Sequence, residues 1–372
     1  MRFLRRSCDT LVVAAAAAAA AAALTLSACG DAGDDSESGQ TSAGFDTTSE
    51  SSSASTGALS TGTTGGPDAT SSSSGGASST STTSGESSGG TGATTSETSE
   101  TSAGTTGAPL EPCNGHVVLC DRPFDQVVFP TTHNSNSALS DGYSQIVANH
   151  TEGIGPQLEH GIRGMLIDVH DHQDAVHMCH GTCTLGNQLH TEGLEIIRDF
   201  LEQHPREVLA IIYQDEVGVD AVVADYEATG LIEQVYAHPD GTPWPTLGEL
   251  IEADTRLVVT AENGGPPPAW YHHVWDVAWD TPYSFMDPDE FSCELNRGSQ
   301  DNDLFLMNHW VNNLINLPSE DNAAIVNAFD VLHGRALECA ESSGKMPNFI
   351  AVDFFLQGDV VAVADALNLD GA

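Results

Sequence analysis

The sequence predicts an α/β fold of the TIM-type (β/α)8 barrel class, with some irregularity in the ring. Three observations indicate it. The part of the chain able to fold, residues 111–372, is about 260 residues long, a usual length for one such barrel. Short apolar segments alternate there with helical patterns, as expected for parallel strands buried on both faces. Several of these segments run into polar residues, which is where barrel enzymes carry their chemistry.

The expected strands follow the apolar, β-branched segments in chain order. They are 126–130, 164–169, 175–179, 208–213, 256–260, 304–308 and 349–354, with a weaker candidate at 273–277. Together they could supply all the strands of a closed barrel.

Helical patterns lie between these strands. In 187–203 the large apolar residues fall on one face, and Pro205 ends the helix. Ser319 precedes two acids, as an N-cap does, and predicts a helix that continues to about Cys339. A shorter helix is expected at 246–253.

The first 110 residues do not predict a folded domain. Residues 1–28 have the basic start, apolar middle and small residues of a secretory signal, ending in a motif that resembles a bacterial lipobox. We expect cleavage before Cys29 and a lipid on its sulfur; an ordinary cleaved signal or a short membrane helix are the alternatives. Residues 29–110 are rich in Ser, Thr and Gly and predict a disordered tether. We therefore expect an exported lipoprotein of the cell envelope, held at the outer membrane or cell surface by its lipid.

The remainder of the chain is strongly acidic. Residues 111–372 hold eight Lys and Arg against 42 Asp and Glu, a formal charge of about −34. This excludes nucleic acid as a partner, because nucleic-acid binding needs a basic face. It also argues against strong attraction to anionic membrane surfaces. We expect a monomer.

Cysteine usage predicts disulfides rather than a thiolate metal site. The folded part contains Cys113, Cys120, Cys179, Cys183, Cys293 and Cys339. An even number in an exported chain predicts that all are paired. The local pairs 113–120 and 179–183 are the simplest arrangement and leave 293–339, although other connectivities stay open.

Polar residues end six of the expected strands. They are His133 with Asn134, Asp168, His180, Asp215 with its neighbours Gln214 and Glu216, Asn308 with His309, and Asp353. Because the carboxyl ends of barrel strands surround one mouth, we expect these side chains to form a single site.

Six segments, taken in order, resemble a known superfamily. They are FPTTHNSNS (129–137), GIRGMLIDVHD (161–171), VHMCHG (176–181), FLEQHPREVLAIIYQDE (200–216), WPTLGELI (244–251) and PNFIAVDFF (347–355). The superfamily is phosphatidylinositol-specific phospholipase C, in its X-domain or PLC-like phosphodiesterase form. The resemblance implies a phosphodiesterase built on a barrel.

The resemblance assigns catalytic roles to three residues. His133 matches the general base, which takes a proton from the hydroxyl beside the phosphodiester, and His180 matches the general acid, which protonates the leaving alkoxide. Two imidazoles that titrate near neutrality can hold opposite protonation states across one phosphate. Asp353 is the expected carboxylate that orients His133, because the last strand of a closed barrel neighbours the first.

The resemblance also implies a divalent cation. Metal-dependent relatives carry an aspartate at the position of Asp168 and an asparagine at that of Asn134. Asp215 is the expected third ligand, with Glu216 as the second choice. Oxygen ligands of this kind suit Ca²⁺, or alternatively Mg²⁺. Leu166 departs from the pattern, since the metal-dependent relatives usually have an acid there.

The expected substrate is a phospholipid or another phosphodiester, phosphoinositide-like, whose headgroup the sequence leaves open. His170, Glu216 and His309 are the expected substrate-binding residues near the mouth. One alternative is glycerophosphodiester hydrolysis or a sphingomyelinase D-like reaction, although those sites usually carry a Glu-x-Asp pair that is absent at Asp168. A second alternative is an envelope binding protein without catalysis on the same barrel.

Overall fold

The computed structural model describes residues 111–370, in which seven strands form a continuous parallel sheet. The order across the sheet is β9-β11-β12-β1-β2-β5-β7. The bounds are β1 (Phe129–Thr132), β2 (Gly164–His172), β5 (Leu209–Glu216), β7 (Leu257–Ala261), β9 (Ala278–Asp280), β11 (Leu304–His309) and β12 (Phe349–Val352).

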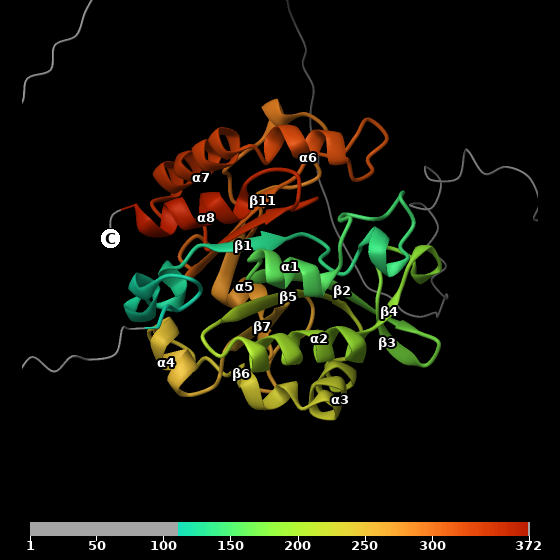
Figure 1. Cartoon of the computed structure of the whole chain (residues 1–372), viewed down its shortest axis with the longest axis vertical. Coiled ribbons are helices and arrows are strands. Elements are labelled where there is room, and N and C mark those ends of the chain that lie inside the picture. Colours follow the sequence, from blue (N-terminus) through green and yellow to red (C-terminus); the bar gives the residue numbers. More distant parts are fainter. Residues whose placement is uncertain (1–110, 371–372) are drawn as a thin grey trace, which may run out of the picture. The chain divides into compact units, whose positions relative to one another are not determined.

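The sheet curls into a barrel with one break. β1 pairs with β12 on one side and with β2 on the other, so the first and last strands lie side by side (Figure 1). The outer edge of β7 carries two short strands, β6 (Val235–Tyr236) and β8 (His272–His273). Within 111–370 no ladder joins these strands to β9, whose own outer edge pairs with the antiparallel β10 (Arg297–Gly298). The predicted TIM-type α/β fold is confirmed, in an irregular form.

One expected barrel strand has another role. β2 returns directly as β3 (Ala175–Met178), which pairs with it antiparallel. The turn residues Gln173 and Asp174 have φ of 51° and 64°, the two positive values of a type I′ hairpin. The prediction of a third parallel strand at 175–179 was therefore wrong, because a two-residue turn cannot make the crossover that parallel pairing requires.

Helices cover the outside of the sheet. They are α1 (Ile154–His160), α2 (His190–Gln203), α3 (Val219–Thr229), α4 (Leu247–Glu252), α5 (Val274–Val277), α6 (Glu320–Val326), α7 (Phe329–Ser343) and α8 (Val360–Leu369). Short 3₁₀ turns lie at Val117–Asp121, Phe124–Gln126, Leu139–Asp141, Cys183–Leu185, Leu231–Gln234 and Pro288–Glu290, and β4 (Gln188–Leu189) extends the β3 hairpin. Figure 1 shows α2 and α3 on one flank of the barrel and α7 and α8 on the opposite flank.

The helix signals in the sequence were largely correct. The expected helix within 187–203 is α2, and the expected cap is present, since the Ser319 hydroxyl accepts a hydrogen bond from the Asn322 N–H. The single helix expected after Ser319 is interrupted at Asn327 and forms α6 and α7. The weak strand candidate at 273–277 is wrong except for His273, which ends β8, because Val274–Val277 form the helical turn α5.

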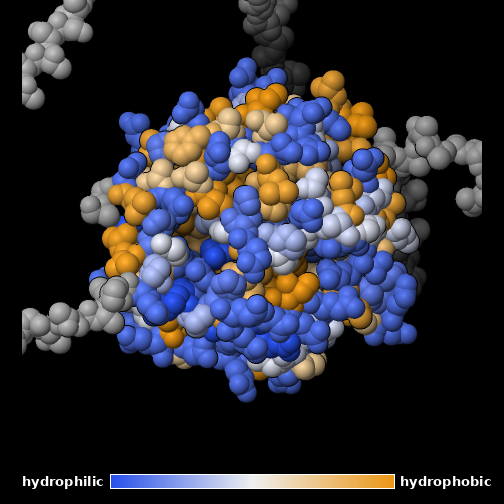
Figure 2. All heavy atoms as spheres, in the orientation of Figure 1, coloured by the Kyte–Doolittle hydropathy of each residue, from blue (hydrophilic) through white to orange (hydrophobic). Residues whose placement is uncertain are grey.

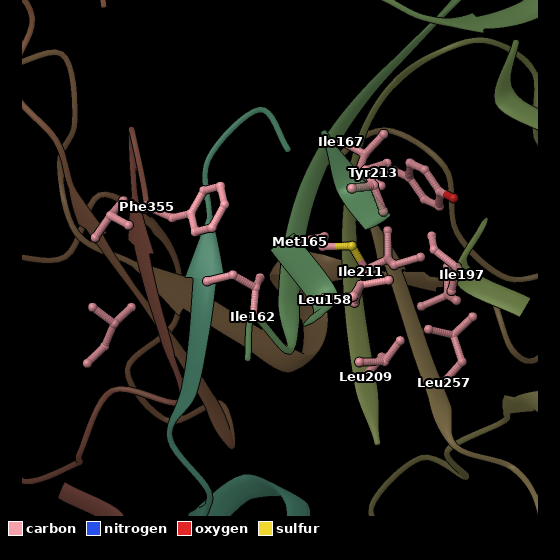
Figure 3. Close-up of a cluster of buried hydrophobic side chains, with 14 of the residues drawn as sticks. Leu158, Ile162, Met165, Ile167, Ile197, Leu209, Ile211, Tyr213, Leu257 and Phe355 are labelled. Atoms are coloured by element: carbon pink, nitrogen blue, oxygen red, sulfur yellow. The ribbon is translucent and has the colours of Figure 1, made fainter. Parts of the chain in front are cut away.

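Strand alternation divides the apolar side chains into two layers. Residues such as Met165, Ile211 and Leu257 point outward and pack against the helices; Figure 3 shows them with Leu158 of α1 and Ile197 of α2. The alternate residues, such as Phe129, Ile212 and Leu306, form the inner layer. Toward the carboxyl ends of the strands the inward positions become polar, and this change creates the candidate site.

Three disulfides pair all the cysteines of the described part as expected: Cys113–Cys120, Cys179–Cys183 and Cys293–Cys339. The face of the molecule drawn in Figure 2 is mostly hydrophilic, as the acidic composition leads one to expect. Among residues 111–370, no helix is long and apolar enough to span a membrane. The predicted signal peptide, the predicted lipid attachment at Cys29 and the predicted tether lie outside the described residues.

Candidate active site

Polar side chains meet at the carboxyl ends of the strands. Two adjoining hollows open there, and they share His133, Asn134, Asp168, Gln214, Tyr283 and Trp310. The inner hollow is completed by Leu166, Ile212, Glu262, Arg297 and Asn308. The outer one is completed by Asn149, His180, Gly181, Ser284, Asn312, Asn316 and Pro318. We call the two hollows together the mouth.

His133 follows β1 and is held by a carboxylate from the end of β12. Its Nδ1 lies 2.9 Å from Asp353 Oδ1, and the Asn149 side-chain amide donates to the same oxygen at 2.9 Å. An ionised carboxylate can only accept, so Nδ1 is the donor and Nε2 of the neutral ring is left as an acceptor. Asp353 is buried. It follows β12, which pairs with β1 as predicted for the last and first strands of the barrel.

His180 lies after β3 in a loop closed by the Cys179–Cys183 disulfide. Its Nδ1 is 2.6 Å from the Val147 carbonyl oxygen, so this nitrogen donates, and Nε2 has no hydrogen-bond partner in the described part of the chain. Burial lowers the pKa of His180, and the nearby His133 lowers it further, while the bond to Val147 acts in the opposite direction. The two predicted catalytic histidines thus line the same outer hollow.

Asp168 lies on the inward face of β2 and lines both hollows. Burial raises the pKa of its carboxyl to about 8, and the charges of Glu262 and Glu216 raise it further. No side chain or N–H among the described residues donates a hydrogen bond to this carboxylate. It is therefore a buried acid whose negative charge lacks compensation from the protein.

Asp215 does not enter the mouth, contrary to the prediction that it binds a metal. Its carboxylate accepts hydrogen bonds from the N–H groups of Asn263 and Gly264 and from the Tyr271 hydroxyl. Side chains alternate along β5, so it is the preceding Gln214 that points into the mouth. The acid at the strand end instead fastens the loop after β7.

The donors that remain for a cation are few. Among residues 111–370 there is no cluster of three His, Cys, Asp or Glu side chains that could hold a metal ion. Asn134, Asp168 and Gln214 offer one carboxylate and two amide oxygens, whereas calcium in proteins takes about 6–8 oxygens. This set, with its uncompensated carboxylate, fits a cation that keeps much of its water. The inward-facing Leu166 contributes no oxygen.

Of the three residues expected to bind substrate, His309 is placed elsewhere, and that prediction was wrong. Its ring is fully buried outside the mouth, with Nε2 2.9 Å from the Val326 carbonyl oxygen and Nδ1 3.0 Å from an Arg335 nitrogen. Burial, with the Arg335 charge, lowers the pKa of His309 to about 3, so the ring is neutral.

The other two lie close to the mouth without lining it. Glu216 is exposed at the end of β5, and its charge contributes to the raised pKa of Asp168. His170 lies two residues beyond Asp168 on β2, and its buried Nε2 has no hydrogen-bond partner within residues 111–370. Neither residue is among those that line the two hollows.

The sequence did not single out an arginine that lines the inner hollow. Arg297 of β10 donates to Asp280 at 2.6 Å and to Glu262 at 2.8 Å. Its guanidinium carbon lies 4.9 Å from the Tyr283 ring centroid. Nothing near Arg297 in the sequence signals this position, since it depends on the antiparallel pairing of β10 with β9.

An irregular α/β barrel with two histidines at its mouth is the arrangement expected of a PLC-like barrel, and comparisons with known proteins agree with this class. The family model PI-PLC X (PI-PLC X 1) matches residues 119–368, about two thirds of the chain. The chain therefore belongs to the PI-PLC X family.

Two relatives are fungal proteins from Arthroderma benhamiae. An "uncharacterized secreted protein" is 28% identical over 289 residues, which cover 69% of this chain and 64% of that protein. A "PI-PLC X domain-containing protein 1" is 28% identical over 277 residues, covering 69% and 89%. The chain thus spans less than two thirds of the first relative's length.

A plant protein and a solved structure are also similar. "PI-PLC X domain-containing protein At5g67130" of Arabidopsis thaliana is 27% identical over 277 residues, covering 66% of this chain and 62% of that protein. The solved structure is a mutant of phosphatidylinositol-specific phospholipase C from Staphylococcus aureus, 12% identical, with a TM-score of 0.49 over 67% of this chain and 95% of that one.

Proposed function

We propose that this protein is a phosphodiesterase of the phospholipase C type, with His133 as base and His180 as acid. One observation carries the proposal: each histidine is held through Nδ1, which leaves two Nε2 atoms without a hydrogen-bond partner among residues 111–370, beside one hollow. An Asp–His pair beside a second anchored histidine is an arrangement suited to general acid–base chemistry.

The proposed reaction forms one phosphorus–oxygen bond and breaks another. A substrate hydroxyl next to the phosphodiester loses its proton to His133 Nε2, and its oxygen attacks phosphorus. The bond from phosphorus to the leaving oxygen breaks, and that oxygen takes a proton from His180 Nε2. The Asp353 carboxylate stabilises the imidazolium that forms at His133. The products are a cyclic phosphate and a free alcohol.

The charge of the phosphate needs compensation in this acidic mouth. Arg297 is the only Lys or Arg among the residues lining the two hollows, and Glu262 and Asp280 already share its charge. We include Ca²⁺ in the proposal, held with much of its water by Asn134 and Asp168, where its charge would offset that of the phosphate. Full activity in the presence of a chelator would show that the reaction needs no metal ion, and the proposed roles of the two histidines would stand.

The rim of the mouth suggests a substrate with a lipid part. Asn312, Asn316 and Pro318 of one loop line the outer hollow. Between them, Leu314 is 91% exposed and Ile315 is 74% exposed. Two such apolar side chains beside the mouth are well placed to contact acyl chains, while Arg297, Glu262 and Asn308 can hydrogen-bond a hydroxylated headgroup.

We further propose that the protein is exported and held to the envelope by a lipid on Cys29. Its three disulfides support export, because such bonds persist in oxidising compartments. The name of a secreted relative is in agreement. A Cys29→Ser variant released into the medium, while the unaltered chain stays with the membrane fraction, is the expected result.

The reaction is tested by following phosphorus. The purified protein is incubated with phosphatidylinositol, phosphatidylcholine and glycerophosphodiesters, with calcium or with chelator, and ³¹P NMR identifies the product. A cyclic phosphate is expected from the inositol lipid, and none from His133→Ala or His180→Ala. His204→Ala is the matched control, since His204 is 38% exposed and lines neither hollow. Choline or glycerol phosphate as the product would contradict the proposed reaction.

A further inference from the structure

A tryptophan covers the ring of the proposed base. Trp310 follows the end of β11, and its indole lies parallel to the His133 imidazole, with centroids 3.7 Å apart and an interplanar angle of 6°. Trp310 is 6% exposed and lines both hollows. Tyr283, which also lines both hollows, is a further aromatic neighbour of Trp310, at 6.2 Å between ring centroids.

The contacts of His133 divide between its edge and its face. Asp353, itself held by the Asn149 amide, binds the Nδ1 edge, and the indole covers one face, so the Nε2 edge is the part left for a substrate. The stacked indole limits rotation of the imidazole about its own axis, which the single hydrogen bond to Asp353 does not. A base held in this way keeps Nε2 in the direction of the substrate hydroxyl.

The same contact favours the charge that appears during the reaction. When His133 takes the proton it becomes a cation, and the face of an indole attracts a cation most strongly where water is excluded. The neutral ring gains less from the stack, so the contact strengthens toward the transition state.

We propose that Trp310 is a positioning residue for the base, which fixes the plane of the His133 ring and stabilises its protonated form. This inference rests on the proposed role of His133 in the reaction. It assigns a function to a residue that the two-histidine mechanism does not use. The opposing explanation is that Trp310 only fills space at the end of β11.

The chain contains a matched control for that explanation. Trp244 stacks on His238 with centroids 3.8 Å apart and an interplanar angle of 4°, and it is 4% exposed. His238 lies outside the mouth. The two stacks therefore have nearly the same geometry and burial, and only one of them includes the proposed base.

The test compares Trp310→Leu and Trp310→Phe with Trp244→Leu and Trp244→Phe in the full chain. For Trp310→Leu we expect kcat to fall about tenfold with KM within twofold, because the contact acts mainly on the charged form of the base. Trp310→Phe, which keeps an aromatic face, should restore much of the rate. The Trp244 variants should lose comparable stability in urea unfolding and keep kcat.

A spectroscopic measurement separates this inference from the proposed function. The indole ring current should shift the His133 ring protons upfield in NMR spectra of the intact protein, and Trp310→Leu should abolish that shift. Equal kcat in Trp310→Leu and in the unaltered protein would overturn the positioning role, as would a loss in Trp310→Phe as large as that in Trp310→Leu. Full activity of His133→Ala would instead overturn the proposed function, whatever the NMR spectra show.

Discussion

Replacement of Asp353 by Asn should test the base most directly, because it removes a charge and keeps the shape. Asp353 Oδ1 receives hydrogen bonds from His133 and from Asn149, both at 2.9 Å. An asparagine oxygen in the same place could accept both bonds. Its amide nitrogen would then stand at the position of Oδ2, which is buried and has no hydrogen-bond partner among the residues that the structure describes. The main loss is therefore the negative charge beside the imidazolium.

The magnitude follows from the separation of the charges. With about 4 Å between the centres of charge and an effective dielectric constant near 20, the attraction is about 4 kcal/mol. If the transition state carries the full imidazolium, this corresponds to about a 10³-fold loss in kcat. KM should change little, because the cation is absent before the proton moves.

The assay is the steady-state release of cyclic phosphate by Asp353→Asn and by a matched control. Asp365 forms the control pair, since its carboxylate lies 2.9 Å from His116 but is 46% exposed and outside the mouth. Asp365→Asn should keep kcat within about twofold, in line with the small contribution of exposed ion pairs. A loss of less than tenfold in Asp353→Asn, with the fold intact by circular dichroism, would refute the assignment of His133 as the base.

Three further results are expected. The proposed acid His180 must be protonated, and burial lowers its pKa. The midpoint of the fall in kcat/KM with rising pH should therefore lie below about 6.5, the usual pKa of histidine. A bound anionic phosphodiester favours the charged ring, so kcat should fall at higher pH than kcat/KM; coincident profiles would contradict this. Leu314→Ser with Ile315→Ser should lower activity on vesicles and spare a short-chain soluble substrate, and equal losses on both would rule out lipid contact. The pKa of Asp168 is raised from 3.8 to about 8 in the folded state. Above pH 3.8 the unfolded chain can ionise this carboxyl and the folded protein cannot easily do so, which lowers the free energy of unfolding. Asp168→Asn should therefore increase the free energy of unfolding by about 2–4 kcal/mol at pH 7 in chelator, and should leave it almost unchanged near pH 4. The same variant should lose activity. Urea unfolding at both pH values checks the effect on stability.

Local signals in the sequence predicted much of the fold. The predicted cap at Ser319 depends on a hydrogen bond within one turn, and it is present. The short helix expected at 246–253 is also present, as α4. The hairpin at 175–179 was missed because its apolar pattern resembles that of a parallel strand. What decides the direction of pairing is the two-residue turn before it, formed at Gln173 and Asp174.

Site residues at strand ends were predicted less evenly. His133, His180 and Asp353 are brought together, since barrel closure sets β12 beside β1. Asp215 was misplaced by one residue. Adjacent side chains on a strand point to opposite faces, so an uncertainty of one position decides whether an acid enters the mouth or fastens a loop.

The sequence by itself predicted the class of fold, the presence of disulfides and the two histidines, because each depends on composition, a local pattern or a motif, whereas the structure decided which cysteines pair. Tertiary structure alone decided how those groups are surrounded. Trp310 reaches the ring of His133 across 177 positions of sequence only because β11 and β12 bring it there. The burial that moves the pKa of Asp168 and the pairing of Arg297 with Asp280 arise in the same way. Contacts between distant segments set the electrostatics of the mouth, and no local pattern encodes them.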